Sequence, residues 1–251
     1  MPPTTIDEVI AQLTDIVDRA RSESSRLGYF AALYRKVTLR VKLGIEQGLF
    51  EDGPRMARLD VNFASRYLAA YELYRQGQRP TASWEVAFDA ASHWRPLILQ
   101  QLLLGINAHI NLDLGIAAVE TSPGAQLAAL QNDFDKINLV LASLVKSVRE
   151  EIGEVSPWIG LLEKIDTNAD DAIINFSLRV ARDESWRFAT KLNALDVGAQ
   201  AAAIAHHDRE TAALGRLVFH PPGIFFNAGL LAIRLRESND VAHVIEVLEQ
   251  A

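Results

Sequence analysis

The chain contains no cysteine among its 251 residues. This absence excludes disulfides, thiolate-bound zinc, iron–sulfur clusters and a cysteine nucleophile. Basic residues are fewer than acidic ones, 25 against 32, and the net charge of −7 argues against sequence-independent binding to nucleic acid, which needs a basic surface. The sequence also lacks a glycine-rich phosphate loop, a dinucleotide fingerprint and a Gly-x-Ser-x-Gly elbow, so it carries no nucleotide or flavin signature.

Long uninterrupted apolar runs are missing as well. The longest candidate, Leu102 to Val119, is broken by the polar residues Asn107, His109, Asn111 and Asp113. These groups would be costly in lipid, so we interpret the segment as a buried helix and expect no membrane span.

The composition is that of an ordinary globular protein, with 49% hydrophobic and 23% charged residues. Residues 1–8 have no basic segment followed by an apolar one, so no signal peptide is predicted and we expect a cytoplasmic protein. The length fits one large domain over residues 1–251, with the best candidate for a hinge near 156–171. A homo-oligomer is compatible with all of these features.

Apolar residues recur at helical spacing over almost the whole chain, and no segment alternates as a strand would. The sequence therefore predicts an all-α fold, a multi-helix bundle of about eight to ten helices without a sheet. The expected helices cover approximately residues 5–24, 29–47, 54–75, 81 or 83 to 92, 96–120, 125–152, 170–194, 197–218, 225–236 and 241–250.

The helix expected over Pro96–Glu120 is apolar on nearly all sides. At about 100° per residue, Gln100, Asn107 and Asn111 share one side, and His109 and Asp113 lie roughly opposite, one turn apart. A buried carboxylate is costly unless it is paired or bound to a cation. His109 is the nearest candidate partner of Asp113.

A second histidine and acid at the same spacing are His206 and Glu210. They fall within a helical stripe of small and apolar residues, so we expect both side chains to point into the core. The stripe consists of Ala199, Ala202, Ala203, His206, Glu210, Ala213, Leu214 and Leu217.

A third candidate, Asp60, lies within the apolar stripe of the helix expected over 54–75. Arg66 and Tyr67 follow within two turns and could satisfy or poise its carboxylate. In a site, Asp60 would be a further ligand or general base and Arg66 would orient an anion; otherwise Asp60 is a salt-bridge partner of an arginine such as Arg66.

These groups support the hypothesis of a metal-dependent hydrolase, with His109, Asp113, His206 and Glu210 as ligands to zinc, manganese or iron. A metal with an open position would supply hydroxide for hydrolysis. The signal is weak, because six histidines and 32 acids in 251 residues give about 0.8 such pairs by chance and two are present.

The alternative is a non-catalytic binding or scaffold protein. Its buried polar groups would form a hydrogen-bond network, and its apolar helices would line a small-molecule pocket or a dimer face. A large apolar cavity in which His109 is bonded only to protein would favour this alternative.

The segment 100–114, with the run Leu104-Gly105-Ile106-Asn107-Ala108-His109-Ile110-Asn111-Leu112-Asp113, resembles a bacterial family defined only as a domain of unknown function. Segments 56–68 and 133–138 fit the same resemblance, which implies an all-helical protein and draws attention to Asp60, Arg66, His109, Asp113 and Asn138.

The two histidine–acid steps are also similar to ligand steps of zinc-dependent phospholipase C and the single-strand nucleases. The N-terminal tryptophan ligand and the additional histidines of those enzymes have no counterpart in this sequence. The likeness is therefore one of motif geometry alone.

Overall fold

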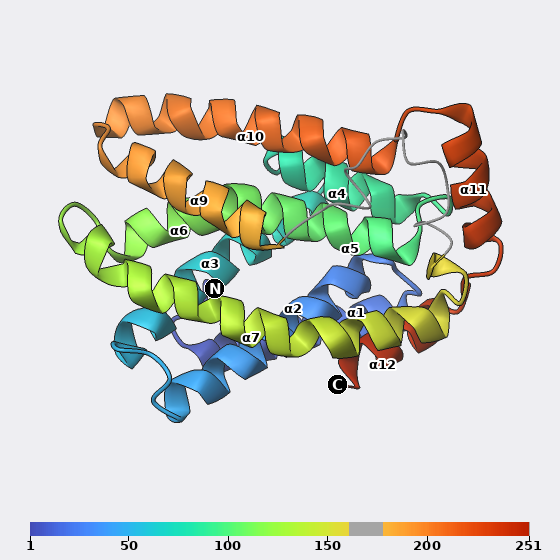
Figure 1. Cartoon of the computed structure of the whole chain (residues 1–251), viewed down its shortest axis with the longest axis horizontal. Coiled ribbons are helices and arrows are strands. Elements are labelled where there is room, and N and C mark those ends of the chain that lie inside the picture. Colours follow the sequence, from blue (N-terminus) through green and yellow to red (C-terminus); the bar gives the residue numbers. More distant parts are fainter. Residues whose placement is uncertain (161–177, 251) are drawn as a thin grey trace.

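The computed structural model describes residues 1–160 and 178–250, and within these ranges every regular element is a helix (Figure 1). The elements are α1 (Ile6–Ser22), α2 (Leu27–Glu46), α3 (Gly53–Arg75), α4 (Ala82–Ser92), α5 (Ile98–Ile106), the π-helical segment η1 (Asn107–Asp113), α6 (Leu114–Thr121), α7 (Gln126–Val155), α9 (Leu178–Asn193), α10 (Val197–Phe219), α11 (Ile224–Arg234) and α12 (Val241–Glu249).

The predicted all-α fold is confirmed, and most helix ends lie within about two residues of the expected ones. The long helix expected over 96–120 is three consecutive segments, α5, η1 and α6. The start of the helix expected at 170 and most of the hinge expected at 156–171 lie outside the described residues.

Several helix starts are fixed by side-chain caps of the kind that sequence patterns indicate. Thr5 accepts a hydrogen bond from the backbone of Glu8 at the start of α1, and Asp52, Asp196 and Asp240 do the same for α3, α10 and α12. Such caps satisfy backbone N–H groups that have no partner inside the helix.

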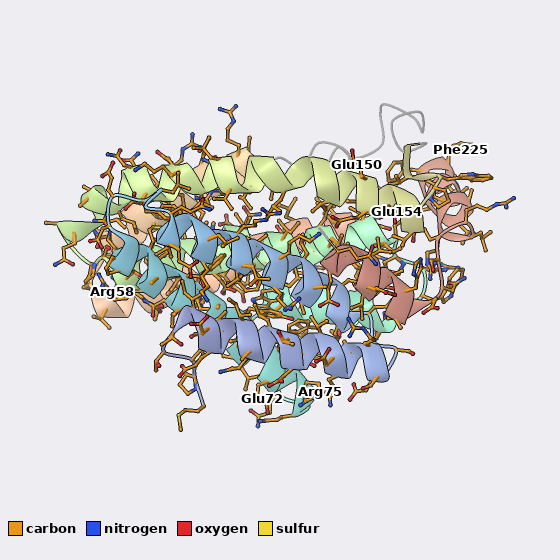
Figure 2. All side chains as sticks on the ribbon, turned by 90° about the horizontal axis from the view of Figure 1, so that it is seen from below. Arg58, Glu72, Arg75, Glu150, Glu154 and Phe225 are labelled. Atoms are coloured by element: carbon orange, nitrogen blue, oxygen red, sulfur yellow. The ribbon has the colours of Figure 1, made fainter. Side chains whose placement is uncertain are left out.

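The α5–η1–α6 segment forms the centre of the bundle. The hairpin of α9 and α10 packs on one side of it together with α4, and α2 and α3 pack on the other (Figure 1). In Figure 2, α7 runs along one edge of the molecule and α1 along the opposite edge, with α2 and α12 between them.

The Ile98–Thr121 helix is long and apolar enough to cross a membrane, but 89% of its most apolar stretch is buried inside the bundle. Its interior position agrees with the interpretation of a core helix. The polar side of this helix faces α10: Gln100 donates to the carbonyl of Val218 and Asn107 to that of Thr211.

The hydrophobic core consists of two clusters. One contains the buried faces of α1, α2, α4, α5 and α12, with the aromatic rings of Tyr29, Phe30, Tyr67 and Trp84. The other lies around α6, the N-terminal half of α7 and α9. Val37, Phe63 and Ile106 contact both clusters and therefore mark the boundary between them.

Candidate functional site

The His109–Asp113 pair lies in the π-helical segment at the centre of the bundle. The backbone N–H of Leu114 bonds the carbonyl of His109, five residues earlier, which is the π-helical pattern. Such segments are rare in proteins and occur frequently at functional sites. The sequence pattern predicted an ordinary helix here and did not reveal this feature.

Asp113 is 1% exposed and accepts three hydrogen bonds. Arg66 Nε, from α3, lies 2.9 Å from its Oδ1. Trp84 Nε1, from α4, lies 2.8 Å from its Oδ2, and His109 Nδ1 lies 3.2 Å from the same oxygen. His109 is thus one of three partners, and the arginine supplies the charge that stabilises this buried carboxylate.

The bond to Asp113 determines the tautomer of His109. Since the carboxylate of Asp113 only accepts, Nδ1 carries the proton and Nε2 presents a lone pair. Within the described residues, Nε2 is buried and has no hydrogen-bond partner. Burial lowers the pKa of His109, against the opposing effect of Asp113, so the ring is neutral.

An aromatic cage holds the imidazole. Phe63 stacks on it with ring centroids 3.5 Å apart, and Tyr34 meets it edge-on at 4.4 Å. Three further rings pack around it at centroid distances of 5.7 to 6.2 Å: Phe30, Trp84 and Tyr67. These contacts fix the orientation of the ring without supplying a donor to Nε2.

Asp60, on α3, is a second buried polar group in this region, and it is 7% exposed. Its Oδ2 finds no hydrogen-bond partner in residues 1–160 or 178–250, and the same holds for the hydroxyl of Tyr34. Burial raises the pKa of Asp60 to about 7. Arg66 bonds Asp113 instead of Asp60, because six residues turn the helix by about 240°.

Between the two core clusters lies a pocket of about 480 Å³. Among the described residues, its polar lining consists of Tyr34, Asp60, His109 and Arg182. The other described lining residues are apolar apart from Gly160: Phe30, Leu33, Val37, Val41, Met56, Leu59, Phe63, Leu99, Leu103, Ile106, Ile110, Leu114, Phe134, Ile137, Leu141, Leu144, Val148, Ile152, Ile159 and Leu178.

Arg182, on α9, is 3% exposed and supplies a cation to the wall. Its Nε donates to Oδ1 of Asn138 at 2.9 Å, a second nitrogen donates to the carbonyl of Phe134, and the guanidinium lies 4.4 Å from the centre of the Phe134 ring. Burial lowers the pKa of Arg182 to about 10. Asn138, singled out by the sequence, therefore positions Arg182.

A profile for a family of unknown function, DUF5995, matches residues 6–221. This range includes the motif around His109 and all four polar residues of the pocket wall. The chain belongs to this family. No match was found among curated proteins or among solved structures.

In this DUF5995 chain, the second histidine–acid pair lies on the surface. His206 Nε2 and Glu210 Oε1 are 3.4 Å apart, and the two side chains are 62% and 59% exposed. The prediction that both point into the core is wrong. The buried face of α10 instead carries Thr211, Ala212, Gly215 and Val218.

The neighbouring residues of α10 face inward. His207 Nε2 lies 2.8 Å from the backbone oxygen of Asn111, and its ring stacks on Phe188. Asp208 accepts from the backbone of Ala82 and Ser83 at the start of α4. α10 buries a different face from the predicted one, because alanine is tolerated in water as well as in the core. On the face that is buried, Gly215 permits close approach to Asn107.

The structure consequently does not combine His109 and Asp113 with His206 and Glu210 in one centre. In the part of the chain that it describes, no three histidine, aspartate or glutamate side chains are grouped closely enough to hold a metal ion. The likeness to zinc-dependent phospholipases and nucleases depended on both pairs, so the geometry gives it no support. Both oxygens of Asp113 are already used by protein donors.

The sequence predicts an apolar small-molecule pocket only as the alternative to a metal site, and it indicates neither the place of the pocket nor the aromatic cage around His109. The signal for the cage is the i, i+4 spacing of Phe30 with Tyr34 on α2 and of Phe63 with Tyr67 on α3. Such spacing puts two rings on one helix face. Any buried helix can have the same pattern, so only the packing of α2 against α3 distinguishes an aromatic cage from ordinary core packing.

Proposed function

We propose that this DUF5995 protein binds a lipophilic small molecule in the pocket between α2, α3, the α5–η1 segment and α7. The observation that carries the proposal is a cavity of ligand-binding size in the core, lined by apolar side chains with a few polar groups. Small-molecule sites in proteins are about 300–1,000 Å³ and have this composition.

Water is a poor occupant of such a pocket. A buried water is held by two to four polar partners, and among the described residues only four polar side chains line the space, so most of the wall offers water no hydrogen bond. An apolar molecule removes this conflict, because it covers the leucine, isoleucine and valine walls and leaves the polar groups for its own polar atoms.

Two polar positions would orient the ligand. On the α2, α3 and η1 side, Asp60, Tyr34 and His109 line the wall, and each has a fully buried polar atom without a partner in the described ranges that a side-chain shift would turn toward a ligand. On the α9 side, Arg182 carries a positive charge close to Asn138 and Phe134. The ligand that fits these walls has a lipophilic body and at least one hydrogen-bonding or anionic group.

Titration with an environment-sensitive apolar fluorophore, such as 1-aminoanthracene, tests the proposal, with long-chain fatty acids as competitors. We expect saturable binding with one site per chain. The variant Val37→Phe adds a ring inside the wall and is expected to weaken binding at least about tenfold, or 1.4 kcal/mol.

The matched control is Val197→Phe, the same change at a position that is 84% exposed. It is expected to bind like the unaltered protein. Binding that is absent from the unaltered chain, or equal in the two variants while both remain folded, would overturn the proposal.

A further inference from the structure

We propose that the pocket ligand is a single-chain carboxylic acid of the fatty-acid type, and that Arg182 binds its carboxylate. The inference rests on the proposed function, since it names the class of ligand for the same pocket. It combines the charge of one lining residue with the length of the pocket.

Arg182 is a buried cation without an acidic partner. Three cationic side chains are buried in the described part of the chain: Lys36, Arg182 and Arg234. Lys36 lies 2.7 Å from Glu151, and Arg234 lies 3.9 Å from Glu237. Within residues 1–160 and 178–250, Arg182 forms hydrogen bonds to neutral oxygens and no ion pair.

The guanidinium of Arg182 still has N–H groups to donate. It carries five of them, and the bonds to Asn138 and to the carbonyl of Phe134 use Nε and Nη2. Nη1 has no hydrogen-bond partner among the described residues and, in contrast to Nε2 of His109, is not fully buried. Because Arg182 also lines the pocket, a ligand there can reach this nitrogen.

The charge of Arg182 is poorly compensated. Two exposed acids, Asp135 and Asp183, favour the charged form from a distance, but burial has the larger effect and lowers the pKa to about 10. The guanidinium is therefore charged at neutral pH. Burying a charge is costly unless it is paired, and a carboxylate inside the pocket would supply the pair in a charge-assisted hydrogen bond.

The pocket is elongated and lies along α7, the helix at the edge of the molecule in Figure 2. Its lining residues on α7 form a stripe at three- and four-residue spacing: Phe134, Ile137, Leu141, Leu144, Val148 and Ile152. At 1.5 Å per residue, this stripe extends about 27 Å. The lining residues of the central helix, from Leu99 to Leu114, extend about 22 Å. A volume of about 480 Å³ spread over such a length is a narrow space.

The cation lies at one end of this space. Arg182 donates to the carbonyl of Phe134 and stacks on its ring, and Phe134 is the first residue of the α7 stripe. The opposite end has the apolar side chains of Ile152 and Ile159. A narrow apolar space with one cation at its end fits a molecule with one anionic group and one unbranched chain.

The number of positive charges favours a carboxylate over a phosphate. Arginine binds both anions through parallel hydrogen bonds. A phosphate monoester carries about −1.5 to −2 charges at neutral pH, whereas a carboxylate carries one. Arg182 is the sole cation of the described lining, so it balances a carboxylate and would leave a phosphate partly unpaired.

Isothermal titration calorimetry with tetradecanoic acid and tetradecan-1-ol tests the inference in the unaltered chain. The two molecules have the same chain length and differ in the charge of the head. We expect one acid per chain, bound at least about tenfold more tightly than the alcohol. From decanoic to dodecanoic to tetradecanoic acid, the affinity is expected to rise by about fourfold for each buried methylene.

Two variants assign the preference to Arg182. Arg182→Met replaces the cation by an apolar side chain and is expected to abolish the preference for the acid, whereas Arg182→Lys keeps the charge and part of the preference. The matched control is Arg187→Met, the same change on α9 at a side chain that is 70% exposed. It is expected to bind both molecules like the unaltered chain. Circular dichroism of each variant verifies that the helices remain intact.

The outcomes separate this inference from the proposed function. Equal affinity for acid and alcohol, tighter binding of tetradecyl phosphate than of the acid, or an undiminished preference in folded Arg182→Met overturns the carboxylate assignment. If the apolar fluorophore still binds in that case, and Val37→Phe still weakens it, the lipophilic pocket stands with a different ligand. If neither the fluorophore nor the acid binds, both proposals fail.

Discussion

His109 and Asp113 are joined through one imidazole nitrogen, with Nδ1 3.2 Å from Oδ2, while the other nitrogen has no partner in the described part of the chain. The relationship is asymmetric. Asp113 is saturated by Arg66, Trp84 and His109, whereas His109 retains one acceptor. The pair His206 and Glu210 has the same spacing and a similar distance of 3.4 Å, but it lies in solvent.

The first prediction compares the two acids of these pairs. Asp113→Asn removes the negative charge beside the half-buried Arg66 and replaces one accepting oxygen of the buried Asp113 by an amide N–H₂ that faces other donors. Breaking a buried pair by altering one partner costs about 3–5 kcal/mol. We expect a loss of this order in the free energy of unfolding, measured by urea denaturation with circular dichroism.

The control is Glu210→Gln, the same chemical change on an exposed acid four residues after a histidine. Surface substitutions of this kind change stability by about 0.5 kcal/mol or less. Equal losses of unfolding free energy in the two variants would contradict the prediction that Asp113 contributes to stability because it is buried.

The second prediction concerns the pH dependence contributed by Asp60. Burial raises its pKa from 3.8 to about 7. Between these two pH values, the folded state holds a proton that the unfolded state releases. The group therefore contributes stability that is full below about pH 4 and is lost as the pH rises through 7. At 1.36 kcal/mol per unit, three units correspond to at most about 4 kcal/mol.

Asp60→Asn keeps the shape and removes the titration. We expect the variant to gain stability relative to the unaltered chain between pH 4 and pH 8, with no further gain above that range. Urea unfolding at each pH measures the difference. Parallel stability profiles for the two proteins would show that Asp60 does not carry a raised pKa.

The helices were predictable because each has a strong local signal. Thr5 with Glu8 marks the start of α1, and Asp52 with Pro54 marks that of α3. The prediction that Asn107 and His109 lie on opposite sides of one helix is also confirmed, because it follows from helical geometry alone. Asn107 faces α10, and His109 faces α2 and α3.

The site was less predictable, because it depends on how helices face one another. The alanine-rich α10 has no apolar stripe strong enough to fix its rotation, so His206 and Glu210 were assigned to the wrong side. The pocket results from imperfect contact between two core clusters, and no single segment of sequence encodes that gap.

The third prediction tests how closely the central helix is packed. Gly115, in α6, faces α9: a Cβ added there would lie 2.8 Å from the backbone oxygen of Ser185 and 2.9 Å from the ring of Phe188. Backbone cannot yield as a flexible side chain can, so α9 would have to move. We expect Gly115→Ala to destabilise the chain by about 1–3 kcal/mol, the usual range for overpacking.

Gly153, in α7, is the matched control, because a Cβ added there meets no atom within 4 Å among the described residues. Glycine inside a helix costs about 0.5–1 kcal/mol relative to alanine, so Gly153→Ala is expected to stabilise the chain by that amount. Thermal and urea unfolding measure both variants. Opposite signs would support close packing of α6 against α9 at Gly115. A stabilising Gly115→Ala would contradict that packing.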